Sequence, residues 1–134
     1  MVFRALIFAC IGITMEVVFT AASAFLFDKP RDRNLWGHST LWMFPVYALA
    51  GPIFPLLSVI LADEWFVLRL LVYICGIWLT ELGSGLALRL LLGEAPWEHS
   101  YRASRWHVDG IIRLDYAPYW AVAGWLFETL SAAL

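Results

Sequence analysis

Residues 74–85 read ICGIWLTELGSG, an apolar run with a single carboxylic acid, Glu81, in its second half. The run belongs to a longer apolar stretch, residues 65–92, which exceeds the about 20 residues that a helix needs to cross a bilayer core. An acid inside such a helix is costly and normally faces protein or a water-filled cavity. The stretch therefore predicts a membrane-spanning helix that carries a buried polar group.

The composition extends this prediction to the whole chain. Of its 134 residues, 62% are hydrophobic and only 15% are charged, whereas soluble domains are about 45–50% apolar. Four stretches are long enough to span a bilayer: residues 2–27, 39–62, 65–92 and 112–133. We therefore expect an all-α membrane protein with four transmembrane helices.

Other protein classes are less compatible with this sequence. The net charge is −2, and no basic run of the kind that binds nucleic acid is present. Cys10 and Cys75 both fall inside predicted spans, where a thiol usually acts as a small apolar residue. The first span is expected to be retained rather than cleaved as a signal peptide, because Glu16 interrupts its apolar run. No cofactor is predicted.

The chain also contains an internal repeat. With an offset of 65, spans one and three share the pattern R-x5-C-x5-E, which aligns Glu16 with Glu81. With an offset of 73, residues from Gly37 and from Gly110 share G-x3-L-x3-P-x2-A-x-A-G-x2-F. We expect two helical hairpins, residues 1–62 and 63–134, of which the second has a longer polar loop at residues 93–111. Such parallel repeats are related by a pseudo-two-fold axis along the membrane normal.

This symmetry would place Glu16 and Glu81 at equal depth, facing each other. Two carboxylates in that position cannot both stay charged and unpaired, so they would share protons or hold a cation. Glu128 is a third acid in a predicted span and is included in the candidate proton or cation site. Alternatively, each glutamate only bonds a neighbouring helix, with Thr14, Thr20, Thr80 and Ser84 as available partners.

Three prolines lie in the second predicted span. Pro45, Pro52 and Pro55 each remove an N–H donor and clash with the preceding turn. We expect this helix to be kinked or broken, and freed carbonyl groups would then face protein or a wet cavity.

The polar loops supply a second group of candidates. The residues concerned are Trp97, Glu98, His99, Ser100, His107, Asp109 and Asp115, with Arg89 as a candidate for an anionic substrate. A metal site that also used His38 is chemically conceivable, but the spacing matches no standard ligand pattern and no metal is predicted. The alternative is an interfacial belt of tryptophan and tyrosine with arginines at lipid headgroups.

Several blocks resemble a known group of membrane proteins. They are GITMEVVFTA at 12–21, LTELGSGLALR at 79–89, APWEHS at 95–100, GIIRLDYAPYW at 110–120 and the final WLFE at 125–128. These blocks resemble the transmembrane protein 229 family and the related bacterial proteins labelled ABC-transporter permease of the CmpB type. The resemblance implies a multipass bundle and shared positions at Glu16, Glu81, Trp97, Glu98, Ser100, Asp115 and Glu128. Where the family pattern has Asp-Tyr, this chain has Glu98-His99.

Three functions follow as expectations. The first is a small transporter or transporter subunit with a paired-glutamate proton or cation site, which would form a homo-oligomer or join a partner membrane subunit. The second is an intramembrane enzyme acting on lipid or headgroup, and the third is a noncatalytic membrane adaptor. An ATPase would be another chain, because no G-x4-G-K-[ST] motif is present.

The lysine and arginine distribution predicts the orientation. With four crossings, one side would carry Arg4 and Arg69 and the other would carry Lys29, Arg31, Arg33, Arg89, Arg102, Arg105 and Arg113. The positive-inside rule then places both termini outside the cytoplasm, in a cytoplasmic (inner) membrane.

Overall fold

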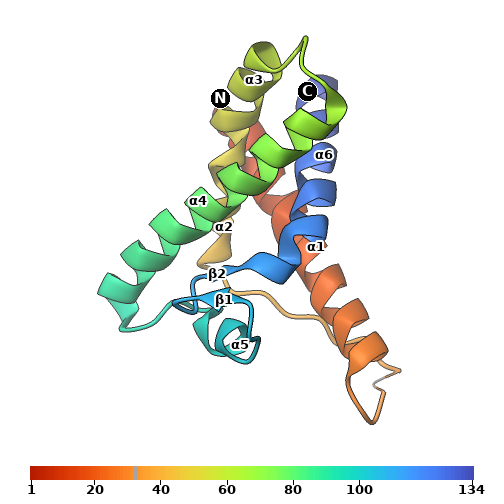
Figure 1. Ribbon diagram of the computed structural model, residues 1–134, viewed down its shortest axis with the longest axis vertical. Helices are drawn as coiled ribbons and strands as arrows, with labels where there is room; N and C mark the ends of the chain where they lie inside the picture. The colour runs from red at the N-terminus through yellow and green to blue at the C-terminus, as the bar shows by residue number, and fades with distance from the viewer. Residues whose placement is uncertain (32) are drawn as a thin grey trace. The chain divides into compact units, whose positions relative to one another are not determined.

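The chain folds mainly into helices. A computed structural model, shown in Figure 1, describes residues 1–31 and 33–134. The helices are α1 (Val2–Phe27), α2 (Met43–Ala48), α3 (Ala50–Ile60), α4 (Phe66–Leu92), α5 (Glu98–Arg102), the 3-10 helix η1 (Leu114–Tyr116) and α6 (Ala117–Ala133). Two short antiparallel strands, β1 (His107–Val108) and β2 (Ile112–Arg113), form a hairpin. The chain divides into two compact units, Met1–Ile53 and Phe54–Leu134.

Three helices in the described part of the chain are long and apolar enough to cross a membrane. They cover Val2–Phe27, Met43–Ile60, which combines α2 and α3, and Phe66–Leu92. Large apolar side chains on them are exposed, such as Leu79 and Leu90. In a membrane this exposure is favourable because the side chains meet lipid. The predicted spans 2–27 and 65–92 are thus helical almost end to end, and the helices indicate a membrane protein.

The second predicted span, 39–62, is shorter and broken as the prolines suggest. Its helix begins at Met43, and α2 and α3 are separated at Leu49. The ring of a proline inside a helix clashes with the carbonyl group four residues earlier, which for Pro52 is that of Ala48. The break therefore falls where the proline chemistry places it.

The fourth predicted span, 112–133, is helical only from Ala117. Residues before it form β2 and η1 instead. Pro118 lies in the first turn of α6, a position where its missing N–H costs nothing. The 17 residues of α6 are fewer than the 18 of the shortest candidate span.

In the first unit, α1 packs against α2. Gly12 makes this contact possible, since a Cβ there would collide with the ring of Tyr47. Farther along α1, Thr20 Oγ1 accepts a hydrogen bond of 2.8 Å from the backbone N–H of His38. Gly37 lies so close to the Val17 carbonyl group that no side chain would fit. The loop after α1 is thereby held against the helix.

In the second unit, α4 packs against α6 around an aromatic cluster. Phe54 lies 5.3 Å from Tyr73 and 5.5 Å from Phe127, measured between ring centroids. All three are nearly inaccessible to solvent. Phe54 is the first residue of the second unit.

We expect the substitution Gly124→Ala to destabilise the protein. A Cβ at Gly124 would overlap the Cβ of Tyr73, and overpacking of this kind typically costs about 1–3 kcal/mol. The matched control is Gly83→Ala, where nothing lies within 4 Å of an added Cβ. Thermal unfolding in detergent should show a lower midpoint for the first variant only; equal midpoints would contradict the packing described.

Candidate functional site

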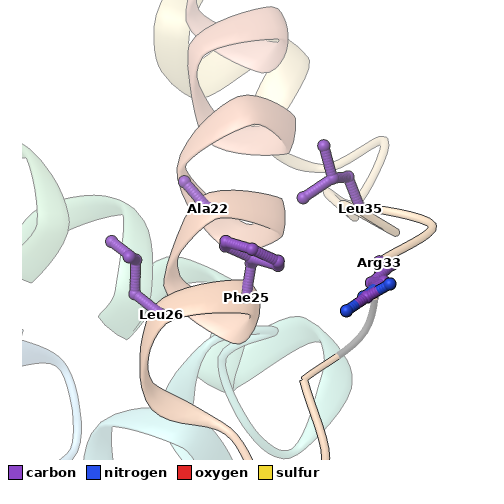
Figure 2. Close-up of a pocket in the computed structure, with 5 residues that line it drawn as sticks. All are labelled: Ala22, Phe25, Leu26, Arg33 and Leu35. Carbon is purple, nitrogen blue, oxygen red and sulfur yellow. The ribbon is translucent and has the colours of Figure 1, made fainter.

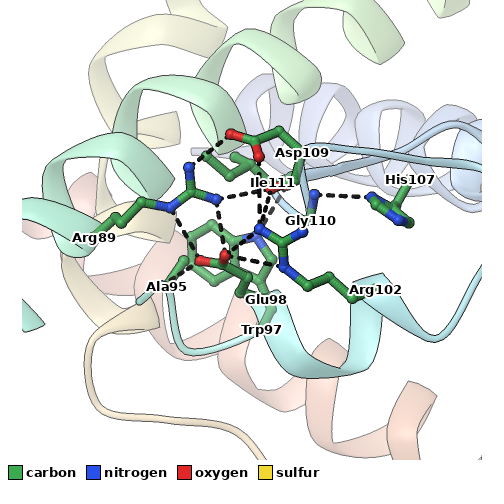
Figure 3. A network of polar contacts seen from close by, with 9 residues as sticks. All are labelled: Arg89, Ala95, Trp97, Glu98, Arg102, His107, Asp109, Gly110 and Ile111. Carbon is green, nitrogen blue, oxygen red and sulfur yellow. Dashed lines mark hydrogen bonds and ion pairs between the residues drawn. The ribbon is translucent and has the colours of Figure 1, made fainter. Parts of the chain in front are cut away.

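The most densely connected polar group of the second unit is Glu98, at the start of α5 (Figure 3). Arg89, near the end of α4, donates to it from Nε at 3.1 Å and from Nη2 at 2.9 Å. Arg102 donates from Nε at 3.2 Å and from Nη2 at 2.7 Å. The backbone N–H of Ala95 adds a bond of 3.1 Å. Glu98 is only 7% exposed, so its buried carboxylate is fully neutralised within the chain.

The same arginines hold the turn between β1 and β2. Arg89 donates to Asp109 Oδ2 at 2.6 Å and to the Asp109 carbonyl at 2.7 Å. Asp109 and Gly110 have φ values of 53° and 70°, and Ile111 N–H bonds the Val108 carbonyl. Positive φ at both central residues of a turn is the geometry that favours Asp-Gly, and Ile111 lies between this turn and β2, because Val108 pairs with Ile112. We call Arg89, Glu98, Arg102 and Asp109 the loop clamp.

The charges of the loop clamp cancel, two arginines against two acids. The bonds from Arg102, Ala95 and Arg89 lower the pKa of Glu98 to about 2. The Arg89 guanidinium likewise holds the pKa of Asp109 below its usual value. A general base works best with a pKa near the operating pH. The loop clamp is therefore poorly suited to proton transfer and well suited to fixing the loop.

Glu81 is a buried acid on α4, in the second unit. It is 9% exposed, and its Oε1 accepts a hydrogen bond of 2.6 Å from Tyr101 Oη on α5. Among the described residues, its Oε2 has no hydrogen-bond partner, and neither has the buried indole nitrogen of Trp120. That indole N–H nevertheless lies near the Glu81 carboxyl group, without hydrogen-bond geometry. The Trp120 indole and the Glu81 carboxyl group are thus a donor and an acceptor close to each other without a well-formed hydrogen bond.

Glu16 has a different environment in the first unit. Its Oε2 accepts hydrogen bonds from Ser39 Oγ at 2.9 Å and from Tyr47 Oη at 3.1 Å. The Tyr47 ring reaches this position because it passes over Gly12, one turn before Glu16 on α1. Glu16 therefore connects α1 to α2 through Tyr47 and to the loop before α2 through Ser39.

Glu128 does not join Glu81. It forms an ion pair with Arg69 near the start of α4. Arg69 precedes Glu81 by 12 residues, which is about 18 Å along a helix. Glu81 and Glu128 therefore belong to two separate sites within the second unit.

The other loop candidates have mainly structural contacts. Trp97 Nε1 donates to the Ile111 carbonyl at 3.0 Å, and His107 Nδ1 accepts from Gly110 N–H at 3.0 Å. Asp115 binds Arg113, which lowers the Asp115 pKa. His99 and Ser100 are exposed. Across the described residues, no three His, Cys, Asp or Glu side chains gather in a way that could hold a metal ion.

Sequence reasoning missed the hydroxyl partners of both glutamates. Of the candidates named from the sequence, Thr14, Thr80 and Ser84 bond carbonyl groups of their own helices, and Thr20 contacts Val17 and His38. No sequence pattern points to Ser39 or Tyr101. For Tyr47 the available signal was the repeat, whose offset of 73 aligns Tyr47 with Trp120. These are two aromatic residues with polar tips, one near each glutamate.

Comparison of this chain with protein-family models, with curated proteins and with solved structures gives no match.

We expect Glu98→Gln to destabilise the protein at neutral pH and to remove the part of its stability that is lost in acid. The Glu98 pKa falls from 4.5 to about 2 on folding, so its stabilising contribution is complete above pH 4.5 and is lost as the pH falls to about 2. Thermal unfolding should show the gap between wild type and variant closing over that range. Glu94→Gln, a change of an exposed acid, is the control; a gap that did not narrow would contradict the assignment.

Proposed function

We propose that the chain is a small multipass membrane transporter or transporter subunit in which Glu16 and Glu81 are proton-binding groups. One observation carries this proposal. Glu81 is 9% exposed, yet its Oε2 makes no well-formed hydrogen bond to a described residue, and the Trp120 indole N–H, which acts on this carboxyl group as a donor, also falls short of one. A buried carboxyl group kept only for structure would be expected to have both oxygens satisfied.

The surroundings of the glutamates favour a proton over a metal cation. Glu16 is surrounded by the hydroxyl groups of Ser39 and Tyr47, and Glu81 by that of Tyr101. A hydroxyl group can donate to a carboxylate and, after rotation, accept from a carboxylic acid. A site for a hard cation would instead assemble several oxygen ligands. The hydroxyl groups can thus satisfy either protonation state.

Matching contacts support duplication of a helical hairpin. The offsets of 65 and 73 align Thr20 with Gly85 and His38 with Ile111. Thr20 bonds His38, and a Cβ at Gly85 would touch the Ile111 side chain. In this proposal α6 completes a fourth crossing, and the two hairpins form a pseudo-two-fold pair with Glu16 and Glu81 at equal depth.

The membrane arrangement and partners belong to the same proposal. In this proposal both termini lie outside the cytoplasm, in an inner membrane, as the lysine and arginine distribution predicts. Four helices enclose little space, so a homo-oligomer or a partner membrane subunit would complete a pathway. The resemblance to the transmembrane protein 229 and CmpB-type permease groups agrees with this role.

A noncatalytic membrane adaptor is the second candidate. The observation in its favour is that Glu16 has two hydroxyl partners and that the loop clamp is closed and neutral. The intramembrane enzyme has less support, because Glu98 and Asp109 are held by arginines and their pKa values are lowered.

Proton flux into proteoliposomes tests the transporter proposal. With a potassium gradient and valinomycin as driving force and a trapped pH dye as readout, we expect Glu81→Gln to reduce flux strongly. The double variant with Glu16→Gln should abolish it, because neither amide can carry the proton. Glu94→Gln, which changes an exposed loop acid, should keep the wild-type rate.

Unchanged flux in the double variant would refute the proton site. Equal background flux in every sample, together with loss of oligomer assembly in the double variant, would instead favour the adaptor.

A further inference from the structure

A pocket of about 680 Å³ lies between the last turns of α1 and the loop that follows it. Figure 2 shows its lining residues, Ala22, Phe25 and Leu26 from the helix and Arg33 and Leu35 from the loop. Four of the five side chains are apolar, and Arg33 is the single charged one. The pocket therefore combines an apolar wall with one guanidinium group.

The return of the loop onto α1 creates this pocket. The bond between His38 N–H and Thr20 Oγ1 and the tight approach of Gly37 to Val17 bring the chain back beside the helix. Leu35 has a φ of 55°, a left-handed conformation that is unusual for leucine. Leu35 thereby faces Phe25 across the pocket (Figure 2).

Within residues 1–31 and 33–134, the cations around this pocket form no ion pair with an acid. Arg33 has no hydrogen bond or ion pair to another described residue, and Arg31 stacks on Phe25 with its Cζ 5.9 Å from the ring centroid. Lys29 adds a third positive charge, and the same stretch of sequence holds two acids, Asp28 and Asp32, of which Asp32 lies outside the described residues. The pocket lies at the end of a helix of membrane-spanning length, where lipid headgroups meet basic side chains.

We propose that this pocket binds an anionic phospholipid. One acyl chain would lie along Ala22, Phe25, Leu26 and Leu35, and the phosphate group would accept hydrogen bonds from Arg33. A guanidinium group suits phosphate because its donors form a planar fork. Inorganic phosphate alone would leave the apolar wall uncovered, and a zwitterionic lipid would gain less from the positive charge.

Lipid retention by the purified full-length protein tests the proposal. The probes are phosphatidylglycerol and phosphatidylcholine with identical acyl chains, titrated in neutral detergent and counted by native mass spectrometry. We expect tighter binding of phosphatidylglycerol and a loss of roughly fivefold in Arg33→Gln, the effect of one basic residue near a membrane surface. Arg105→Gln is the control, because Arg105 stacks on Trp106 and does not line the pocket.

Ala22→Phe separates the pocket from simple charge attraction, since it fills the apolar wall and keeps Arg33. It should also lower phosphatidylglycerol binding severalfold, with the helix content unchanged by circular dichroism. Wild-type binding in Ala22→Phe, or equal losses in Arg33→Gln and Arg105→Gln, would overturn the proposal. So would a change of oligomeric state in Ala22→Phe without loss of lipid, because a second copy of the chain would then be the occupant. Competition by inorganic phosphate alone would mean that the acyl chain is not recognised.

Discussion

The ion pair between Arg89 and Glu98 is the contact on which the polar half of the second unit depends. Arg89 and Glu81 are two turns apart on one face of α4, and Glu98 and Tyr101 share a face of α5. The helices are therefore joined at two points, by Arg89 to Glu98 and by Tyr101 to Glu81. The ion pair fixes α5, and α5 in turn brings a hydroxyl group to a carboxyl group inside a membrane-length helix. In an apolar environment the Glu81 carboxyl group needs a partner such as the Tyr101 hydroxyl group, because no water is available to replace it.

The helices of this chain could be predicted more completely than its contacts. Uninterrupted apolar runs fixed α1 and α4 within a residue or two, and Pro52 fixed the break between α2 and α3. The ends of the other two spans could not be found from hydropathy alone. Ser39 precedes the helix and bonds Glu16 instead. Residues 112–113 pair with β1 across the Asp-Gly turn, and residues 114–116 form η1, where Asp115 bonds Arg113.

The candidate site was predictable by residue type but not by pairing. Glu81, Glu98, Asp109 and Arg89 could be selected because charge in an apolar chain is rare. Which acid meets which base depends on contacts between distant residues, such as the 20 positions between Arg89 and Asp109. Tyr101 was assigned to an interfacial belt because aromatic residues near span ends usually belong there. Its bond to Glu81 arises from the docking of α5, which no local pattern encodes.

The two glutamates differ in a way that the longer second loop explains. The loop after α1 returns directly, and residues 39 and 47 supply both hydroxyl partners of Glu16. The loop after α4 is longer and contains α5, so the hydroxyl partner of Glu81 comes from Tyr101 in that added segment. Trp120, aligned with Tyr47, cannot replace a hydroxyl group, because an indole N–H donates but does not accept. Glu81 is thus the copy whose open oxygen is fully buried, which makes it the stronger candidate for proton exchange.

The distribution of unpaired charge also separates the two loops. In and beside the second loop, Arg89, Arg102 and Arg113 are paired with acids. Most of the positive charge there is therefore neutralised within the fold. In the first loop Lys29, Arg31 and Arg33 are not paired with any described acid. Since exposed charge attracts anionic headgroups and neutralised charge does not, the first loop is where an anionic lipid would be held. Similar residues therefore have different surroundings in the two loops: arginines paired with acids in the second, and basic residues without a described acidic partner in the first.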